Sequence, residues 1–262
     1  MIAALNLGLI DYGTALRLQE SLAELRKQGR IPDVLLLLEH PPVITLGRNA
    51  KESNVVATRE FLAARDVEVF EINRGGDVTF HGPGQLVGYP IFDLRGFSPR
   101  LGAVDYVRKL EEVLIRTCAH YGIPAQRIKG MTGVWAEAGH GEERKIAAIG
   151  VHISRGVTSH GFALNITTDL EQFKLIVPCG LAKPVTSIAM ERGAPVPLDE
   201  VVQVVARQFG MVFSSEIVWL ESFDDLPGSA EGDRKDRVWP QDTPVKAPEN
   251  LRRLRGEDTH LA

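Results

Sequence analysis

Four glycines, a guanidinium, a hydroxyl and an imidazole occur together within the twelve residues 74–85 of this chain. Glycine lets a backbone come close to a ligand, whereas the polar side chains of Arg74, Thr79 and His81 are costly to bury unless they find partners. Such a mixture is unfavourable in the core of a protein. The segment 74–85 is therefore predicted to be a binding site, and the simpler alternative is a glycine-rich hairpin whose polar side chains are solvated.

An apolar, strand-like run at 86–92 follows this segment, so the glycines do not open a helix as they do in phosphate-binding loops. The sequence also contains neither GxxxxGK[ST] nor GxGxxG. Both observations argue against a nucleotide-phosphate site.

Lys145 stands where a polar loop enters an aliphatic run. A lysine in such a place can point inward, where loss of solvent would lower its pKa and allow proton exchange near neutral pH. The alternative is a solvated residue at the end of a strand, beside Arg144. His81, His152 and His160 could be imagined as a metal set, but no carboxylate or thiol lies at a ligand-like spacing, and we expect no metal.

The two cysteines have different surroundings. Cys118 lies within the apolar stripe of a predicted helix and is expected to be a small buried hydrophobe. Cys179 lies in a Pro-Cys-Gly turn, where a thiol is accessible and the Gly180 amide could donate to a developing oxyanion. A thiol exchanges acyl groups with a thioester without nucleotide activation. A papain-like protease is a weaker interpretation, because the local cysteine and histidine signatures of that family are absent.

The elements that must position these residues alternate along the chain without a repeat. Apolar spacing predicts helices at 12–28, ending at Gly29, and at 103–121 and 198–213. Strands are expected at 34–38 (buried and central), 43–46, 67–72, 86–92, 134–137, 146–153 and 161–166. This order, mostly hairpin-linked strands with a few helices outside them, predicts an α+β fold.

Size and composition fit a soluble protein of one main domain, which we expect at 1–225. With 30 basic and 34 acidic residues the formal charge is -4, which gives no general affinity for nucleic acid. No apolar run is long enough to span a membrane and no signal peptide is evident, so the expected location is the cytoplasm. Residues 226–262 are polar and charged, and we expect a poorly ordered tail with Trp239 docking on the body.

Five sequence blocks together resemble the lipoyl(octanoyl) transferases. The resemblance covers about residues 5–215, with the blocks in family order and at family-like spacing. In this chain the blocks read Glu39-His40-Pro41 with Val43, Thr45 and Gly47; Arg74-Gly75-Gly76-x-x-Thr79-x-His81-Gly82-Pro83-Gly84-Gln85; Lys145-Ile146-Ala147-Ala148-Ile149-Gly150-Val151; His160-Gly161-Phe162-Ala163-Leu164-Asn165; and Pro178-Cys179-Gly180.

The resemblance implies the fold of the biotin and lipoate protein ligases, a mixed and mostly antiparallel sheet flanked by helices. It also implies transfer of an octanoyl group from acyl carrier protein to a specific lysine of lipoyl domains, in 2-oxoacid dehydrogenase E2 subunits and the glycine cleavage H protein. Cys179 would carry the acyl thioester, and Lys145 would lower the pKa of Cys179 and move the proton. A free thiol near pKa 8.5 is only a few per cent ionised at pH 7, and an adjacent ammonium favours the thiolate.

The same resemblance implies an acyl pocket and no cofactor, neither metal nor nucleotide. His81 and His152 would orient the thioester carbonyl or brace Lys145, with His160 and Asn165 as further supporting residues. The implied pocket residues are Arg74, Gly75, Gly76, Asp77, Val78, Thr79, Phe80 and His81, the turn Ala148, Ile149 and Gly150, and Gly161, Phe162 and Ala163.

Two rivals share this fold. A lipoate or biotin ligase would activate its acid with ATP, and Cys179 argues against that chemistry. A lipoyl-domain binding module would have lost its chemistry, and the presence of both Lys145 and Cys179 argues against that.

Overall fold

The computed structural model describes residues 1–137, 143–177 and 184–228. Its strands are β1 (Ile2–Leu9), β2 (Asp33–Glu39), β3 (Val43–Leu46), β4 (Glu68–Glu71), β5 (Val78–His81), β6 (Gln85–Ile91), β7 (Ala125–Ile128), β8 (Met131–Ala136), β9 (Arg144–Ser154), β10 (Val157–Asn165) and β11 (Ile217–Trp219). Its α-helices are α1 (Tyr12–Lys27), α2 (Arg59–Ala63), α3 (Ala103–His120), α4 (Ile188–Arg192) and α5 (Leu198–Phe213).

Eight of the described strands form one mixed sheet in the order β11-β1-β2-β6-β10-β9-β8-β7. The pairs β1–β11 and β1–β2 are parallel, and every other pair in this sheet is antiparallel. A second, three-stranded sheet has the order β4-β3-β5. The fold is therefore α+β with a mixed, mostly antiparallel sheet, as the sequence predicts.

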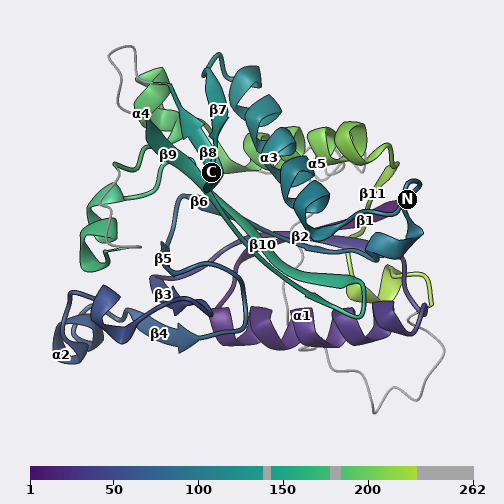
Figure 1. Cartoon of the computed structure of the whole chain (residues 1–262), viewed down its shortest axis with the longest axis horizontal. Helices are drawn as coiled ribbons and strands as arrows, with labels where there is room; N and C mark the ends of the chain where they lie inside the picture. The colour runs from purple at the N-terminus through teal and green to yellow at the C-terminus, as the bar shows by residue number, and fades with distance from the viewer. Residues whose placement is uncertain (138–142, 178–183, 229–262) are drawn as a thin grey trace, which may run out of the picture.

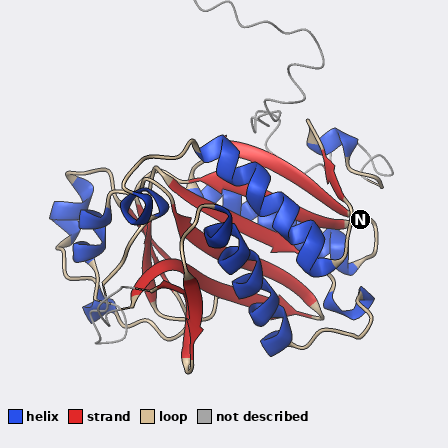
Figure 2. Ribbon diagram, turned by 90° about the horizontal axis from the view of Figure 1, so that it is seen from above, coloured by secondary structure: helices blue, strands red, loops and turns tan. Residues whose placement is uncertain are grey.

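Helices cover both faces of the large sheet (Figure 1). Helix α1 packs on one face, and α3 and α5 pack side by side on the other (Figure 2). The sequence of β2 is apolar without interruption because both of its faces are buried. Leu35 and Leu37 face the core under α3 and α5, while Leu36 and Leu38 face the core under α1. A strand buried on both faces has no polar side, which is the pattern expected of a central strand.

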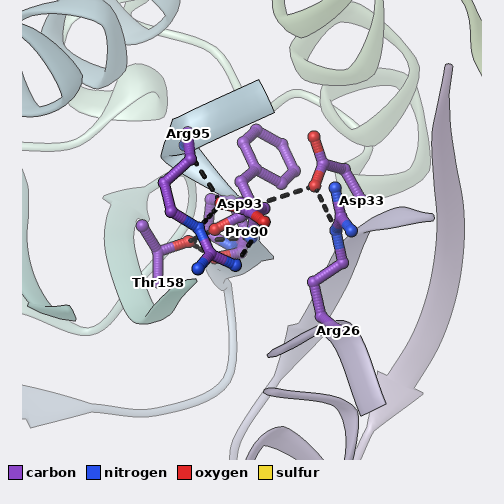
Figure 3. A network of polar contacts seen from close by, with 7 residues as sticks. Arg26, Asp33, Pro90, Asp93, Arg95 and Thr158 are labelled. Atoms are coloured by element: carbon purple, nitrogen blue, oxygen red, sulfur yellow. Dashed lines mark hydrogen bonds and ion pairs between the residues drawn. The ribbon is translucent and has the colours of Figure 1, made fainter. Parts of the chain in front are cut away.

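A polar brace fixes the end of α1 to the large sheet (Figure 3). Asp33 accepts from Arg26 of α1 at 2.7 Å and from the backbone N–H of Asp93 at 2.8 Å. Arg95 in turn donates two bonds to the Asp93 carboxylate, and the Thr158 hydroxyl donates to the carbonyl of Pro90 at 2.7 Å. These bonds tie α1 to β2 and to the ends of β6 and β10.

The small sheet has its own apolar core. Ile44 of β3, Phe80 of β5 and Leu62 of α2 are buried there together. Because β3 follows β2 after a two-proline turn, and β5 precedes β6 by three residues, the small sheet is held beside the large one. The space between the two sheets is where the candidate site lies.

Most predicted elements are confirmed, with small shifts at their ends. Helix α1 begins after Asp11, whose carboxylate accepts from Thr14 N, and Gly29 follows its end at φ 71°. One expectation is wrong: Ala148, Ile149 and Gly150 do not form a turn, because they lie inside the long strand β9 and pair with β10. The expected docking of Trp239 falls outside the described residues, as does most of the tail.

Candidate active site

A cavity of about 430 Å³ lies between the two sheets. Strands β6, β9 and β10 of the large sheet form one side, and β5 with the glycine-rich loop before it forms the other. Tyr12, the first residue of α1, also lines it. A volume of this size is ordinary for a pocket that binds a small ligand.

Most of the residues predicted from the sequence line this cavity. They are Arg74, Gly76, Asp77, Val78, Thr79, His81, Lys145, Ala148, Ile149, Gly150, His160, Gly161, Phe162, Ala163 and Asn165. Gly75 and Phe80 are not among the lining residues. Gly75 donates its N–H to the carbonyl of Val151, and the Phe80 ring packs on Phe173 in the core of the small sheet.

His152 lies away from the cavity. Its Nδ1 is 2.7 Å from Nη2 of Arg48, which is an N–H donor, at the surface of the protein. His152 is also seven residues from Lys145 along β9, roughly 23 Å at about 3.3 Å per residue. The expectation that His152 braces Lys145 or orients a carbonyl therefore does not agree with the geometry.

Small side chains keep the sheet side of the cavity open. Ala163 pairs with both Val87 and Ala148, and the next pair on the same face is Gly161 with Gly150. Paired residues point to the same face of a sheet, so this arrangement leaves a trough along β9 and β10. Gly150 has a second reason to lack a side chain, because a Cβ there would lie 2.7 Å from the carbonyl oxygen of Gly75.

Arg74 fixes the glycine-rich loop from inside. Its guanidinium donates to the carbonyl and hydroxyl of Thr45 and to the carbonyl of Gly75. Burial lowers the pKa of Arg74, an effect opposed by the nearby Tyr12, Tyr89 and Asp77. A buried guanidinium with three carbonyl or hydroxyl partners holds β3 and the loop together at one end of the cavity.

Three buried histidines form a cluster next to the cavity. Burial lowers the pKa of His40 to about 4 and the pKa values of His81 and His160 to about 3 each. All three are therefore neutral at physiological pH. His40 Nδ1 is 2.7 Å from the carbonyl of Ile10 and its Nε2 is 2.7 Å from the hydroxyl of Tyr89.

His160 reaches the cavity through an unusual backbone. Its φ of 54° is in the left-handed region, which is uncommon for a residue other than glycine. The strand alternation is broken there. The imidazole lies 2.8 Å from Oδ1 of Asn73 and edge-on to Tyr89, rather than among the core residues that Phe162 and Leu164 join.

A chain of hydrogen bonds joins His81 to the backbone of Lys145. His81 Nδ1 is 2.7 Å from Gln85 Oε1, and Gln85 Nε2 donates to Asn165 Oδ1 at 2.9 Å. Asn165 Nδ2 donates to the carbonyl of Thr186 at 2.9 Å, and Thr186 N donates to the carbonyl of Lys145 at 2.9 Å. Asn165 and Gln85 thus connect the glycine-rich segment to the strand that carries Lys145.

Lys145 lines the cavity at the start of β9. Its ammonium lies over the Trp135 ring, 4.7 Å from the centroid. The pairing of β8 with β9 shifts register between Val134 and Trp135. Just before this shift, a Cβ on Gly133 (φ 123°) would lie 2.7 Å from the carbonyl oxygen of Ala147. The sequence of β8 therefore allows a close approach to β9 beside Lys145.

Cys179 lies outside the described residues, and the structure gives no position for it. The described residues on either side are held near the cavity: Pro184 accepts from Lys145 N at 2.9 Å, and Val177 N donates to Asn54 at 2.8 Å. The other cysteine, Cys118, is fully buried in α3, and burial raises its pKa to about 12. Cys118 is thus an inert core residue, as predicted.

Some residues that line the cavity were not predicted from the sequence. Tyr12, Tyr89, Phe173 and Val185 come from four separate elements or loops and carry no local motif. Gln85 is the last residue of the glycine-rich segment, and His81 is its neighbour in that segment, but its contact with Asn165 follows only from the pairing of β6 with β10. Among the described residues no group of three or more histidine, cysteine or acidic side chains could hold a metal ion. Nor does any described helix have the length and apolar character needed to cross a bilayer.

Comparison with known proteins identifies the family. Residues 11–210 match the lipoyl protein ligase A/B catalytic domain. The octanoyltransferase of Koribacter versatilis is 58% identical over 262 residues, which is all of both chains. The octanoyltransferase of Acidobacterium capsulatum is 59% identical over 231 residues, covering 85% of this chain and 94% of that one.

Solved structures agree on the fold. A bipartite lipoate protein ligase from Thermoplasma acidophilum superposes with a TM-score of 0.64 at 15% identity, covering 85% of this chain and 87% of that one. A lipoate-protein ligase A bound with ATP gives 0.61 at 15% identity, covering 83% and 88%. At such identities the likeness concerns the fold alone, which is that of the lipoate ligases. Together with the sequence matches, it shows that this chain belongs to the lipoyl protein ligase A/B catalytic family and, within it, to the octanoyltransferases, a group of acyltransferases.

Proposed function

We propose that the protein takes an octanoyl group from octanoyl-acyl carrier protein onto the thiol of Cys179 and passes it to a specific lysine of lipoyl domains. The acceptors would be the lipoyl domains of 2-oxoacid dehydrogenase E2 subunits and the glycine cleavage H protein, in the cytoplasm. The observation that carries this proposal is the position of Lys145. Its side chain lines an otherwise largely apolar cavity, and its backbone N–H donates to the carbonyl of Pro184.

In the first half-reaction the Cys179 thiolate attacks the thioester carbonyl, and the carrier thiolate leaves. The Lys145 ammonium stabilises the cysteine thiolate and then gives a proton to the leaving thiolate, so the lysine becomes neutral. The two described residues that flank Cys179 in the sequence, Val177 and Pro184, are hydrogen-bonded to Asn54 and to the backbone N–H of Lys145. These bonds support a thiol close to Lys145.

In the second half-reaction the neutral amine of the acceptor lysine attacks the enzyme thioester. An amide bond forms, the cysteine thiolate leaves, and the proton lost by the amine passes to Lys145. The enzyme returns to its starting charge state. Neither step consumes ATP, because the energy of the thioester is kept until the amide forms.

The trough over Ala148, Ala163 and the paired glycines supports a straight aliphatic chain as the bound group. Burial is worth about 0.8 kcal/mol per methylene, so an octanoyl chain gains several kcal/mol there. The octanoyl chain would be accommodated between β10 and β9 on one side and residues 76–79 on the other.

The experiment is to incubate the protein with octanoyl-acyl carrier protein without ATP and to measure its intact mass. We expect an octanoyl adduct that hydroxylamine removes and that Cys179→Ala lacks. In Lys145→Arg the fold and a positive charge remain, but a guanidinium does not release a proton in this range, so turnover should be lost. Strict dependence on ATP and free octanoate would instead make the protein a ligase, and near-normal turnover in Lys145→Arg would rule out the proton shuttle.

A further inference from the structure

Two side-chain amides beside the cavity have orientations that the backbone determines. Asn165 Nδ2 faces the carbonyl of Thr186 at 2.9 Å, and Gln85 Nε2 faces the carbonyl of Phe80 at 3.2 Å. A carbonyl oxygen only accepts, so the atom facing it in each amide is the nitrogen. The two amides are therefore aligned in one direction, with Gln85 Nε2 also donating to Asn165 Oδ1.

This alignment determines the tautomer of His81. Gln85 Oε1 lies 2.7 Å from His81 Nδ1, and an amide oxygen only accepts, so Nδ1 carries the proton. The pKa of His81 is lowered to about 3, first by burial and then by His40, Arg74 and His160 around it. The imidazole is therefore neutral at physiological pH, and its Nε2 holds a lone pair.

The ring of His81 is held in place on both sides. Tyr12 stacks on it with 6.2 Å between ring centroids, and His40 meets it edge-on at 5.9 Å. His81 lines the cavity, and no described atom is hydrogen-bonded to its Nε2. The result is a fixed hydrogen-bond acceptor on the cavity wall, connected through Gln85, Asn165 and Thr186 to Lys145.

We propose that Nε2 of His81 accepts a hydrogen bond from the attacking amine of the acceptor lysine in the second half-reaction. This inference rests on the proposed function and adds a residue that binds the amine. It also excludes one of the expected roles, since a nitrogen with a lone pair cannot donate a hydrogen bond to a thioester carbonyl.

The weak basicity of His81 suits this role. A neutral imidazole of low pKa orients an N–H without removing the proton, so the proton remains for Lys145. As nitrogen attacks the carbonyl it becomes more positive, and the hydrogen bond to Nε2 strengthens. The interaction is thus stronger in the transition state than in the ground state, which is the condition for raising the rate.

The test separates the two half-reactions in single-turnover experiments. His81→Phe keeps an aromatic ring between Tyr12 and His40 and removes the acceptor. We expect octanoyl loading from the carrier protein within about threefold of the unaltered protein, and transfer to a lipoyl domain slower by about tenfold or more. His120→Ala, which changes an exposed histidine at the end of α3, is the matched control and should change neither rate.

Three results would overturn the proposal: transfer at the unaltered rate, loading slowed as much as transfer, or a proton on Nε2. The last is measured directly, by ¹⁵N NMR of the histidine side chains in the unaltered protein, and needs no variant that folds. We expect His81 to be protonated at Nδ1 alone. Absence of an octanoyl adduct on the unaltered protein would refute the proposed function instead, while the NMR result would still decide the tautomer.

Discussion

The buried histidines predict that the protein loses stability in mild acid. In the folded protein the pKa values of His40, His81 and His160 are about 4, about 3 and about 3, whereas an unfolded histidine titrates near 6.5. Below pH 6.5 these histidines become protonated in the unfolded chain but stay neutral in the folded protein. Stability is therefore complete above pH 6.5 and falls as the pH falls toward the folded pKa values.

The magnitude follows from the same shifts. Between pH 7 and pH 5.5 each imidazole costs about 1.2 kcal/mol of unfolding free energy, so the three together cost about 4 kcal/mol. That is a large part of the 5–15 kcal/mol typical of a folded domain. Carboxylates whose pKa values are lowered, such as Asp93, titrate below this window and contribute little to the change.

The assay is urea unfolding at pH 7 and pH 5.5, with His160→Asn as the informative variant. Asparagine tolerates the left-handed φ of 54° and removes one of the three titrating groups, so the loss should shrink to about 2.5 kcal/mol. The exposed His120→Asn should keep the full loss. A loss below about 1 kcal/mol in the unaltered protein, or the same loss in His160→Asn, would refute the view that these histidines are neutral and buried.

Other predictions concern the walls of the cavity and the end of the chain. In Gly88→Ala the new Cβ would lie 2.2 Å from the Phe162 ring, which lines the cavity and would have to shift. We expect a loss of about 1–3 kcal/mol by urea unfolding together with slower octanoyl loading, and unchanged values for both would show that the Phe162 ring has room. The Glu111 carboxylate is fully buried, accepts from Gly133 N and pairs with Arg108 and Arg127, which are partly exposed. Glu111→Ala should therefore cost about 1–3 kcal/mol by urea unfolding, and no measurable loss would argue against these contacts. We propose 1–225 as the catalytic domain and 226–262 as a dispensable tail, but Phe223 and Leu226 are buried in the core under α1. Truncation after Gly228 should therefore leave turnover and melting temperature nearly unchanged, whereas truncation before Phe223 should lower the melting temperature; a large loss from the first cut would contradict the tail assignment.

Local sequence was sufficient for the elements with strong periodicity. Helix α5 was predicted with the bounds Leu198–Phe213 that the structure shows, and β2 was predicted as a buried central strand. Helix α5 buries one face against the large sheet, and β2 is covered by helices on both faces, so burial explains the apolar pattern of each.

Elements that depend on distant partners were missed. Strand β5 has only four residues and is held by pairing with β3, and β1 pairs in parallel with β2 and β11. Ala148, Ile149 and Gly150 fall within the strand predicted at 146–153, whereas the resemblance implied a turn there. The pairing of β9 with β10 shows that the strand is correct.

The site was predicted residue by residue but not as a network. The motif around Arg74 and the lysine at the mouth of β9 were visible, because their residue types are unusual in those contexts. The direction of the hydrogen bonds from Thr186 to His81, and the left-handed backbone of His160, depend on which strands pair and in which register. No local pattern in the sequence contains that information.

Passage of the octanoyl group through a thioester on Cys179 to a lysine of the lipoyl domain can be followed directly. The most direct measurement is a chase: the octanoylated protein is isolated free of carrier protein and ATP, a lipoyl domain is added, and the masses of both proteins are followed. We expect the octanoyl mass to leave Cys179 and to reappear on one lysine of the lipoyl domain at the same rate. An octanoylated protein that keeps its acyl group while the lipoyl domain stays unmodified would contradict this expectation.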